Sequence, residues 1–328
     1  MNHNLNRCLP WLALSISALA IFSTPAASQT YPTRPIRLVV PQAPGSSTDI
    51  ASRILGEALG ASMGQQVVVD ARPGAGGSIG AGIVARALPD GHTVLMAIIS
   101  THAINVGIYS NLPYHPINDF AAVSLVATGP YVLLVHPALP AVSVKELIAY
   151  ARSRPGEITF ASGGNGTGTH LSGEMLKQMT GIKMLHVPYK GTTPGLTDLM
   201  AGQVSIMFTG LPPALPHLKS KRLRALALTG AKRSSIVPEM PTMAEAGISG
   251  YVVEPWFGIV APAGTPPAII KKLNLEIADK VRIPEIRDKF AGLGLEATST
   301  TPQAFGDFVQ SEIRKWGRVI EESGTRAQ

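Results

Sequence analysis

The chain has 328 residues, a formal net charge of +7 and one cysteine, Cys8. That length can bury a proper core and suggests two domains of ordinary size. Downstream of Cys8, disulfides, thiol nucleophiles and cysteine-ligated metal are excluded. Lysine and arginine are scattered and 5% of the residues are aromatic, so the composition argues against a nucleic-acid surface.

The first 28 residues have the pattern of a secretory signal peptide. One cation, Arg7, precedes an apolar run from Leu9 to Phe22, and Ala26-Ala27-Ser28 offers small residues before a cut. The run of about 14 residues is shorter than the roughly 20 that span a bilayer, and no later run is long enough. We expect export to the periplasm with cleavage near Ser28-Gln29; an N-terminal membrane anchor is the alternative.

From Ile36 onward, short β-branched runs alternate with helical patterns. Apolar residues recur at helical spacing from Ile50 to Met63 and again from Ile79 to Leu88. The strands predicted around these helices are Ile36–Val40, Val67–Val69 and Thr93–Ile99. This βαβαβ order predicts a parallel sheet with helices on its faces.

The same order repeats further along the chain. Ser143 and Glu146 have the spacing of a capping box, which predicts a helix through about Arg154. Further helices are predicted over Leu171–Met179 and Pro194–Gly202. The predicted strands are Tyr131–Val135, Ile158–Ala161, Lys183–Val187, Val204–Phe208 and Leu223–Leu228. Two α/β lobes in series explain the pattern.

The C-terminal part holds too few strands for an independent domain. Strands at Tyr251–Val253 and Phe257–Val260 precede helices over Pro266–Val281, Pro284–Ala291 and Pro302–Ser323. We therefore expect the chain to return, crossing near Thr128–Pro130 and Gly247–Gly250. Lobe 1 would comprise residues 29–128 and 251–328, and lobe 2 residues 129–250, with a hinged cleft between them. A tandem arrangement without return is the alternative.

Three glycine-rich segments join a predicted strand to a predicted helix: Pro41–Asp49, Arg72–Gly80 and Ser162–His170. The first-turn N–H groups of a helix have no intrahelical partner, so such a junction can hold an anion by its backbone. Glycine lets the ligand approach closely. The alternative is that Ser47, Thr48 and Thr169 are ordinary helix caps and the glycines serve tight turns.

Motifs for other chemistry are weak. The chain has no P-loop and no clustered metal ligands, and we expect no metal and no cofactor. Gly76-Gly-Ser78-Ile-Gly80 matches the G-x-S-x-G motif of serine hydrolases, but a nucleophile elbow follows its strand directly, and here Ala71–Gly77 intervene. Of the histidines, His102 and His170 suit loop tethering and His186 suits a core position.

At these loops the sequence resembles a known family, the Bug-type (TctC) receptors, which are the solute-binding components of tripartite tricarboxylate transporters. The resemblance rests on motifs spread in order over the chain. They include Arg34–Pro41 with Gly45–Asp49, Arg72–Gly80, Pro89–Thr93, Leu112–Tyr114, Ser162–Leu171, His186–Gly191, Pro194–Val204 and Ala261–Pro266. The His-Val-Pro-Tyr-Lys-Gly element combined with the glycine loops is a specific signal.

The resemblance implies a two-lobed periplasmic-binding-protein (Venus flytrap) fold, each lobe a mostly parallel sheet flanked by helices. It implies no catalytic activity: the protein would pass a dicarboxylate, tricarboxylate or aromatic acid to membrane permease subunits, as a monomer. Water would bridge Asp49 to the ligand. The residues implied to bind the ligand are Gln42, Ser47, Thr48, Asp49, Ser100, Thr101, Ser162, Gly164, Asn165, Gly166, Thr167, Gly168 and Thr209.

The sequence departs from the family pattern at three places, one of which is Gly45-Ser46, where the family has a glycine pair before the acidic turn. Gln42 stands where an aromatic residue is common, and Thr209 where many relatives carry a charged or amide residue. Gln42 is therefore expected either to reach a second polar group of the ligand or to face solvent. The alternatives to transport are an extracytoplasmic serine hydrolase using Ser78 and a ligand-binding sensory receptor.

Overall fold

The structure is a computed structural model that describes residues 31–324. The predicted signal peptide, residues 1–28, lies outside the described residues. Within 31–324, no helix has both the length and the apolar character needed to cross a bilayer.

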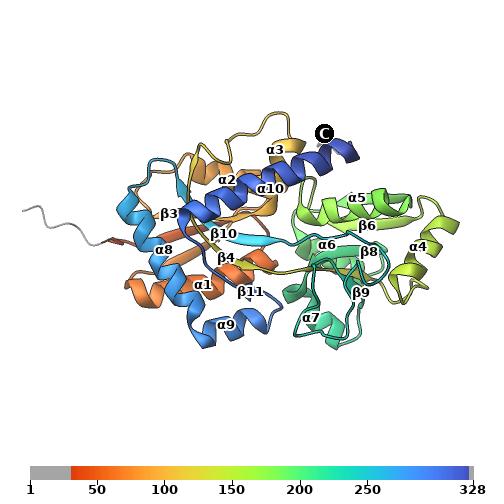
Figure 1. Cartoon of the computed structure of the whole chain (residues 1–328). Helices are drawn as coiled ribbons and strands as arrows, with labels where there is room; N and C mark the ends of the chain where they lie inside the picture. The colour runs from red at the N-terminus through yellow and green to blue at the C-terminus, as the bar shows by residue number, and fades with distance from the viewer. Residues whose placement is uncertain (1–30, 325–328) are drawn as a thin grey trace, which may run out of the picture. The chain divides into compact units, whose positions relative to one another are not determined.

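The first lobe is built on a six-stranded sheet of order β11-β4-β10-β3-β1-β2. Its strands are β1 (Ile36–Val40), β2 (Val67–Ala71), β3 (Thr93–Ile98), β4 (Phe120–Thr128), β10 (Trp256–Pro262) and β11 (Glu296–Ala297). Strand β1 runs parallel to β2 and β3, whereas β10 runs antiparallel to β3 and β4, beside which it lies in Figure 1. The C-terminal strand β10 is therefore inserted among strands from the first part of the chain.

The second lobe is built on a five-stranded sheet of order β7-β6-β8-β5-β9. Its strands are β5 (Tyr131–Val135), β6 (Ile158–Ser162), β7 (Met184–Pro188), β8 (Ile206–Gly210) and β9 (Arg224–Leu228). Strand β6 is parallel to β7 and β8, and β5 is antiparallel to β8 and β9. The predicted fold class, two α/β lobes, is confirmed. Both sheets are mixed, because β10 in the first lobe and β5 in the second run antiparallel to their neighbours.

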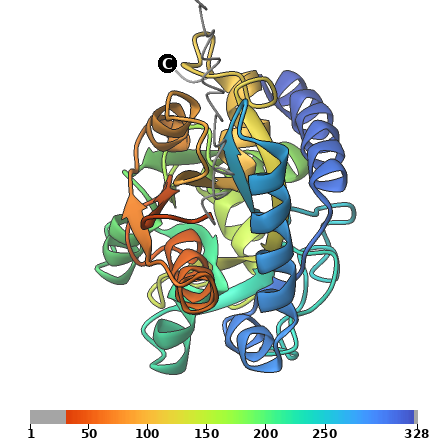
Figure 2. The same ribbon diagram turned by 90° about the vertical axis from the view of Figure 1, so that its left-hand side faces the viewer.

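Helices flank both sheets. In the first lobe they are α1 (Ser47–Met63), α2 (Ser78–Ala85), α3 (Asn105–Ile108), α8 (Pro267–Arg282), α9 (Pro284–Ala291) and α10 (Pro302–Ser323). Helix α8 packs against β4 and α1, as Figure 2 shows, and α10 reaches from β4 to α5 of the second lobe. The helices of the second lobe are α4 (Val144–Ser153), α5 (Gly168–Thr180), α6 (Thr192–Met200) and α7 (Leu211–Lys219).

Two neighbouring segments join the lobes. The first is the turn between β4 and β5, where Gly129 N donates to Pro255 O over 3.1 Å. The second is the stretch from Val253 to Trp256. Val253 O accepts a hydrogen bond from Thr229 Oγ1 of the second lobe, and Trp256 is the first residue of β10 in the first lobe. Because the two segments are hydrogen-bonded to each other, they form a narrow connection of the kind about which lobes can rotate.

Some local predictions were wrong. Tyr251–Val253 is not a strand: Tyr251 N donates to Ile248 O and Val253 N to Thr229 O, so no ladder forms, and burial accounts for the apolar side chains. Strand β4 and helix α7 were missed. Helix α7 contains Pro212, Pro213 and Pro216, which normally argue against a helix, but two of these prolines lie in its first turn, where a missing N–H is tolerated.

Candidate functional site

The first-lobe loop ends at a capped helix. Ser46 caps α1, because its Oγ accepts from Asp49 N over 3.3 Å. The alternative reading of Ser47 and Thr48 as caps is therefore wrong. The two side chains belong to the first turn of α1, and the hydroxyl of Ser47 faces Gly210 of the second lobe: a Cβ on Gly210 would overlap it.

Asp49 is held by a cation of its own lobe. Its carboxylate accepts from Gly45 N at 3.0 Å and from Arg53 Nε and Nη2, each at 3.0 Å, while its side chain is 4% exposed. The loop Pro41–Asp49 contains no arginine, but Arg53 lies one helical turn beyond Asp49. This ion pair offsets the repulsion that Asp49 would otherwise exert on a bound anion.

Gln42 turns toward α1 instead of solvent. Thr48 Oγ1 donates to Gln42 Oε1, which orients the side-chain amide so that its two N–H donors point away from Thr48. Within residues 31–324 these donors have no hydrogen-bond partner. Gln42 is therefore prepared to donate to a ligand acceptor.

In the second-lobe loop, several predicted side chains are occupied by local structure. Ser162 Oγ lies 2.6 Å from His186 Nε2. Thr167 caps α5, because its Oγ accepts from His170 N over 3.2 Å and donates to Gly164 O over 2.7 Å. Thr169 is not the cap; its hydroxyl accepts from Gly163 N over 2.9 Å. The backbone N–H groups of Gly164, Gly166 and Thr167 are also used within the loop, which leaves chiefly those of Asn165 and Gly168 for a ligand.

The glycines of this loop allow the lobes to approach each other. A Cβ on Gly166 would lie 2.9 Å from Asn105 Oδ1, and one on Gly168 would lie 3.1 Å from Ile99 Cγ2, both of the first lobe. Gly164 and Gly166 have φ values of 121° and 75°, which side-chain-bearing residues rarely adopt. The carbonyl of Asn165 accepts from Tyr109 of the first lobe at 3.1 Å. Close interlobe contact thus accounts for glycines that the sequence suggested for anion binding.

A fourth strand-to-helix junction was missed at the sequence level. Between β7 and α6 the chain runs through Gly191, with φ of 106°, to Thr192, and no side chain caps α6. Thr193 Oγ1 donates to Pro44 O of the first lobe over 2.8 Å. Because α6 has no capping side chain, the first-turn N–H groups near Thr192 can donate to a ligand. Gly191, four residues beyond the end of the predicted strand Lys183–Val187, was the signal that could have revealed it.

These elements surround a cavity of about 20 Å³ between the lobes. Gln42, Ser47 and Thr48 are the predicted site residues that line it. The full lining is Gln42, Ser47, Thr48, Ile98, Ile99, Tyr131, Thr169, Thr192, Gly210, Pro255, Trp256 and Phe257. The donors at this cavity are hydroxyl and amide groups, which are neutral. Burial raises the pKa of the Tyr131 hydroxyl, which keeps it protonated. The remaining walls are apolar. A volume of about 20 Å³ holds roughly one water.

The other predicted residues lie nearby in the fold but do not line this cavity. Thr101 Oγ1 bonds Ile98 and His102 Nδ1. Ser100 and Thr209 are 1% and 0% exposed, and their hydroxyls have no hydrogen-bond partner among the described residues. Buried hydroxyls are normally satisfied, so these two are the remaining candidates for a ligand or an ordered water.

The buried histidines are neutral and structural. Burial lowers the pKa of His102 to about 3, and its ring packs against Phe120. His170 and His186 stack with ring centroids 3.9 Å apart, and burial lowers their pKa values to about 4 and about 3. A neutral imidazole carries no charge with which to bind an anion, so these rings support the loops mechanically.

The hydrolase alternative finds no support at Ser78. This residue is 4% exposed, and its Oγ accepts from Asn105 Nδ2 over 3.0 Å; an amide cannot take up a proton as a general base. Between residues 31 and 324 no group of three or more potential metal ligands occurs.

Comparison with known proteins identifies the family. Residues 51–325 match the model of the tripartite tricarboxylate transporter family receptor. The chain is 38% identical to Protein BugT of Bordetella pertussis over 98% of this chain and 99% of that protein. Among solved structures, it resembles R. palustris Rpa4515 with adipate (38% identity, TM-score 0.88, 90% of this chain and 99% of that one).

Two further structures agree. MatC from Rhodopseudomonas palustris with bound malate has 32% identity and a TM-score of 0.84 over 88% of this chain and 100% of that one. The periplasmic binding protein BugD has 33% identity and a TM-score of 0.87 over 91% and 100%. The chain therefore belongs to the Bug/TctC family of periplasmic solute-binding receptors and is not an enzyme.

Proposed function

We propose that this protein captures a small dicarboxylate between its lobes and delivers it to the permease of a tripartite tricarboxylate transporter. One observation carries the proposal: neutral hydrogen-bond donors from both lobes meet at one cavity whose other walls are apolar. Donors aimed at one point hold a carboxylate through charge-assisted hydrogen bonds without an ion pair.

The distribution of donors favours a ligand with two polar ends. Gln42 and Ser47 belong to the first lobe, whereas Thr192 and Tyr131 belong to the second. Ile98 and Phe257 supply apolar surface that suits methylene groups between two carboxylates. The relatives whose structures carry adipate and malate are both bound to dicarboxylates, which supports this class over aromatic acids and tricarboxylates.

Binding on this scheme requires the lobes to separate and close. A cavity of about 20 Å³ is smaller than any dicarboxylate, so the ligand would enter an opened cleft and the lobes would close around it. We assign the hinge to the segments around Gly129 and Pro255, with residues 29–128 and 251–328 moving as one lobe. The backbone amides of Asn165 and Gly168 and the unpartnered hydroxyls of Ser100 and Thr209 would then complete the ligand shell, with water between the ligand and Asp49.

Calorimetric titration with adipate, malate, citrate and benzoate tests the ligand class. We expect 1:1 binding of a dicarboxylate, and at a hundredfold excess over Kd about 2.7 kcal/mol of added stability. Gln42→Glu should weaken binding at least tenfold, because a carboxylate would replace a donor. Gln66→Glu, at an exposed position, is the matched control and should bind like wild type.

Two results would count against the proposal. The interlobe site loses its support if no dicarboxylate binds, or if both glutamate variants bind equally well. Transport is tested separately in cells: deletion of the gene should abolish uptake of the bound dicarboxylate. Normal uptake despite binding would indicate a sensory role.

A further inference from the structure

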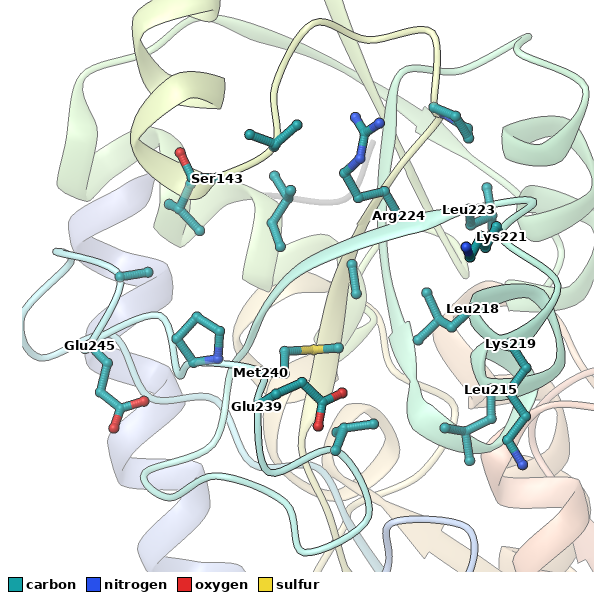
Figure 3. A pocket seen from close by; sticks show the side chains of 18 of the residues that line it. Ser143, Leu215, Leu218, Lys219, Lys221, Leu223, Arg224, Glu239, Met240 and Glu245 are labelled. Atoms are coloured by element: carbon teal, nitrogen blue, oxygen red, sulfur yellow. The ribbon is translucent and has the colours of Figure 1, made fainter.

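A second cavity, of about 890 Å³, lies in the second lobe alone (Figure 3). It is distinct from the interlobe site. Tyr131, at one end of β5, lines the interlobe cavity, whereas Arg224 lines the second cavity and pairs with Val135 at the other end of that strand. Four residues at about 3.3 Å each place the two ends roughly 13 Å apart.

The wall of this cavity is mostly apolar, and it comes from α7, β9, the loop after β9 and the start of α4, which contributes Val144. Helix α7 contributes Leu215 and Leu218, strand β9 contributes Leu226, and the loop that follows contributes Ile236 and Met240. In Figure 3 the side chains of Leu215, Leu218 and Met240 extend toward the hollow. Ligand cavities of 300–1,000 Å³ with such walls typically bury a molecule with a substantial apolar part.

The polar residues of the cavity are mainly basic. The cations among the lining residues are Lys145, Lys219, Lys221 and Arg224, and none of them makes an ion pair within residues 31–324. Arg224 Nη1 donates to the carbonyls of Leu139 and Ala141, which fixes its position without neutralising it. The excess of unpaired positive charge favours an anion.

The acidic residues do not balance this charge. Glu239 and Glu245 line the cavity, but Glu245 is bound to Arg233 at 2.8 Å and accepts from Thr242 N at 2.9 Å. Of these two lining carboxylates, only Glu239 makes no ion pair with another described residue. A cationic ligand would therefore meet several lysines and a single free carboxylate.

The backbone at the cavity edge gives a further indication. Lys221 has φ of +57°, and its N–H donates to Leu218 O just after the end of α7. Glycine is the usual residue in this left-handed position. A lysine there adopts a less favourable conformation and holds its stem and charge at the edge of the apolar wall. Unusual backbone geometry of this kind is concentrated at ligand sites.

We propose that this cavity binds a second ligand, an amphipathic anion of the aliphatic monocarboxylate class. The hydrocarbon chain would lie against Leu215, Leu218 and Met240, and the carboxylate would meet one of the two lysines at the edge, Lys219 or Lys221. A dicarboxylate such as the interlobe ligand fits poorly, because its second charge would be desolvated on the apolar wall. This site is independent of the interlobe function.

Titration with decanoate below its micellar concentration is the direct test, with butyrate and decylamine as matched probes. We expect saturable 1:1 binding of decanoate and affinity that falls by up to about fourfold for each methylene removed. Decylammonium, of equal length and opposite charge, should not bind. The Lys219→Gln/Lys221→Gln variant should bind decanoate at least threefold more weakly, since each exposed charge pair contributes up to about fivefold.

The control is Lys183→Gln/Lys271→Gln, which removes two exposed lysines outside the cavity. It should bind decanoate like wild type. The proposal is overturned by any of three results: no saturable binding of decanoate, equal binding of decylammonium, or equal affinity of the two double variants. All four lysines are exposed, so the variants should fold normally, which circular dichroism will check.

Discussion

The contact between Gly210 and Ser47 provides a direct test of lobe closure. Gly210 has φ −66° and ψ 156°, a conformation that alanine adopts freely. A Cβ there would nevertheless overlap Ser47 Oγ and lie 2.9 Å from Ser47 Cβ, across the interlobe boundary. Gly210→Ala should therefore leave each lobe intact while keeping the lobes from closing fully.

The magnitude follows from the cost of overpacking. Inserting a methyl group into a filled contact typically costs about 1–3 kcal/mol, which is roughly a 5- to 150-fold loss of affinity. We expect dicarboxylate affinity to fall in this range while the melting temperature of the ligand-free protein changes little. Calorimetric titration and thermal unfolding give the two quantities. Gly317→Ala, where no atom lies within 4 Å of the added Cβ, is the control.

A double-mutant cycle tests whether Gly210→Ala acts through its contact with Ser47. Ser47→Gly lowers affinity by deleting a donor, but it also makes room for the new methyl, so Gly210→Ala should cost less in that background. Additive losses, or wild-type affinity in Gly210→Ala alone, would refute the idea that binding depends on this approach of the lobes. A large drop in the melting temperature of the ligand-free variant would assign the contact to the folded core.

Three further predictions concern the residues around the site. Thr167→Ala should lower the stability of the ligand-free protein by about 1 kcal/mol in urea unfolding, because the cap of α5 is lost; an unchanged midpoint would contradict the capping role. Arg53→Gln leaves Asp49 buried without its cation, so dicarboxylate affinity should fall and stability should drop by about 1–2 kcal/mol, whereas Lys272→Gln, in an exposed pair, should do neither. Because the folded pKa of His102, about 3, lies below its ordinary 6.5, protonation favours the unfolded chain: its contribution is intact above pH 6.5 and falls by about 2 kcal/mol by pH 5. The decrease between pH 7 and 5 should be smaller by that amount in His102→Gln, and equal decreases would show that the ring is not held neutral.

The sequence determined most of the local structure and the family. Hydrophobic periodicity predicted a helix through Met63, where α1 ends, and Gly64 caps it with a left-handed φ of 67°. It placed β1 at Ile36–Val40 and α9 at Pro284–Ala291 with the observed bounds. Such patterns can be recognised in a sequence because they depend on residues only a few positions apart. The prediction of a strand at Tyr251–Val253 was wrong, because these apolar residues are buried without pairing with another strand.

The composition of the candidate site was decided by tertiary structure. Gln42, Ser47 and Thr48 could be named from their loop, but Thr192 and Gly210 reach the same cavity from elements far along the chain. Whether a hydroxyl is free or already used, as in Thr167, depends on caps and cross-lobe neighbours that no local pattern encodes. Ser47 contacts Gly210 only because the two lobes lie against each other. This contact joins residues far apart in the sequence, so no local pattern predicts it.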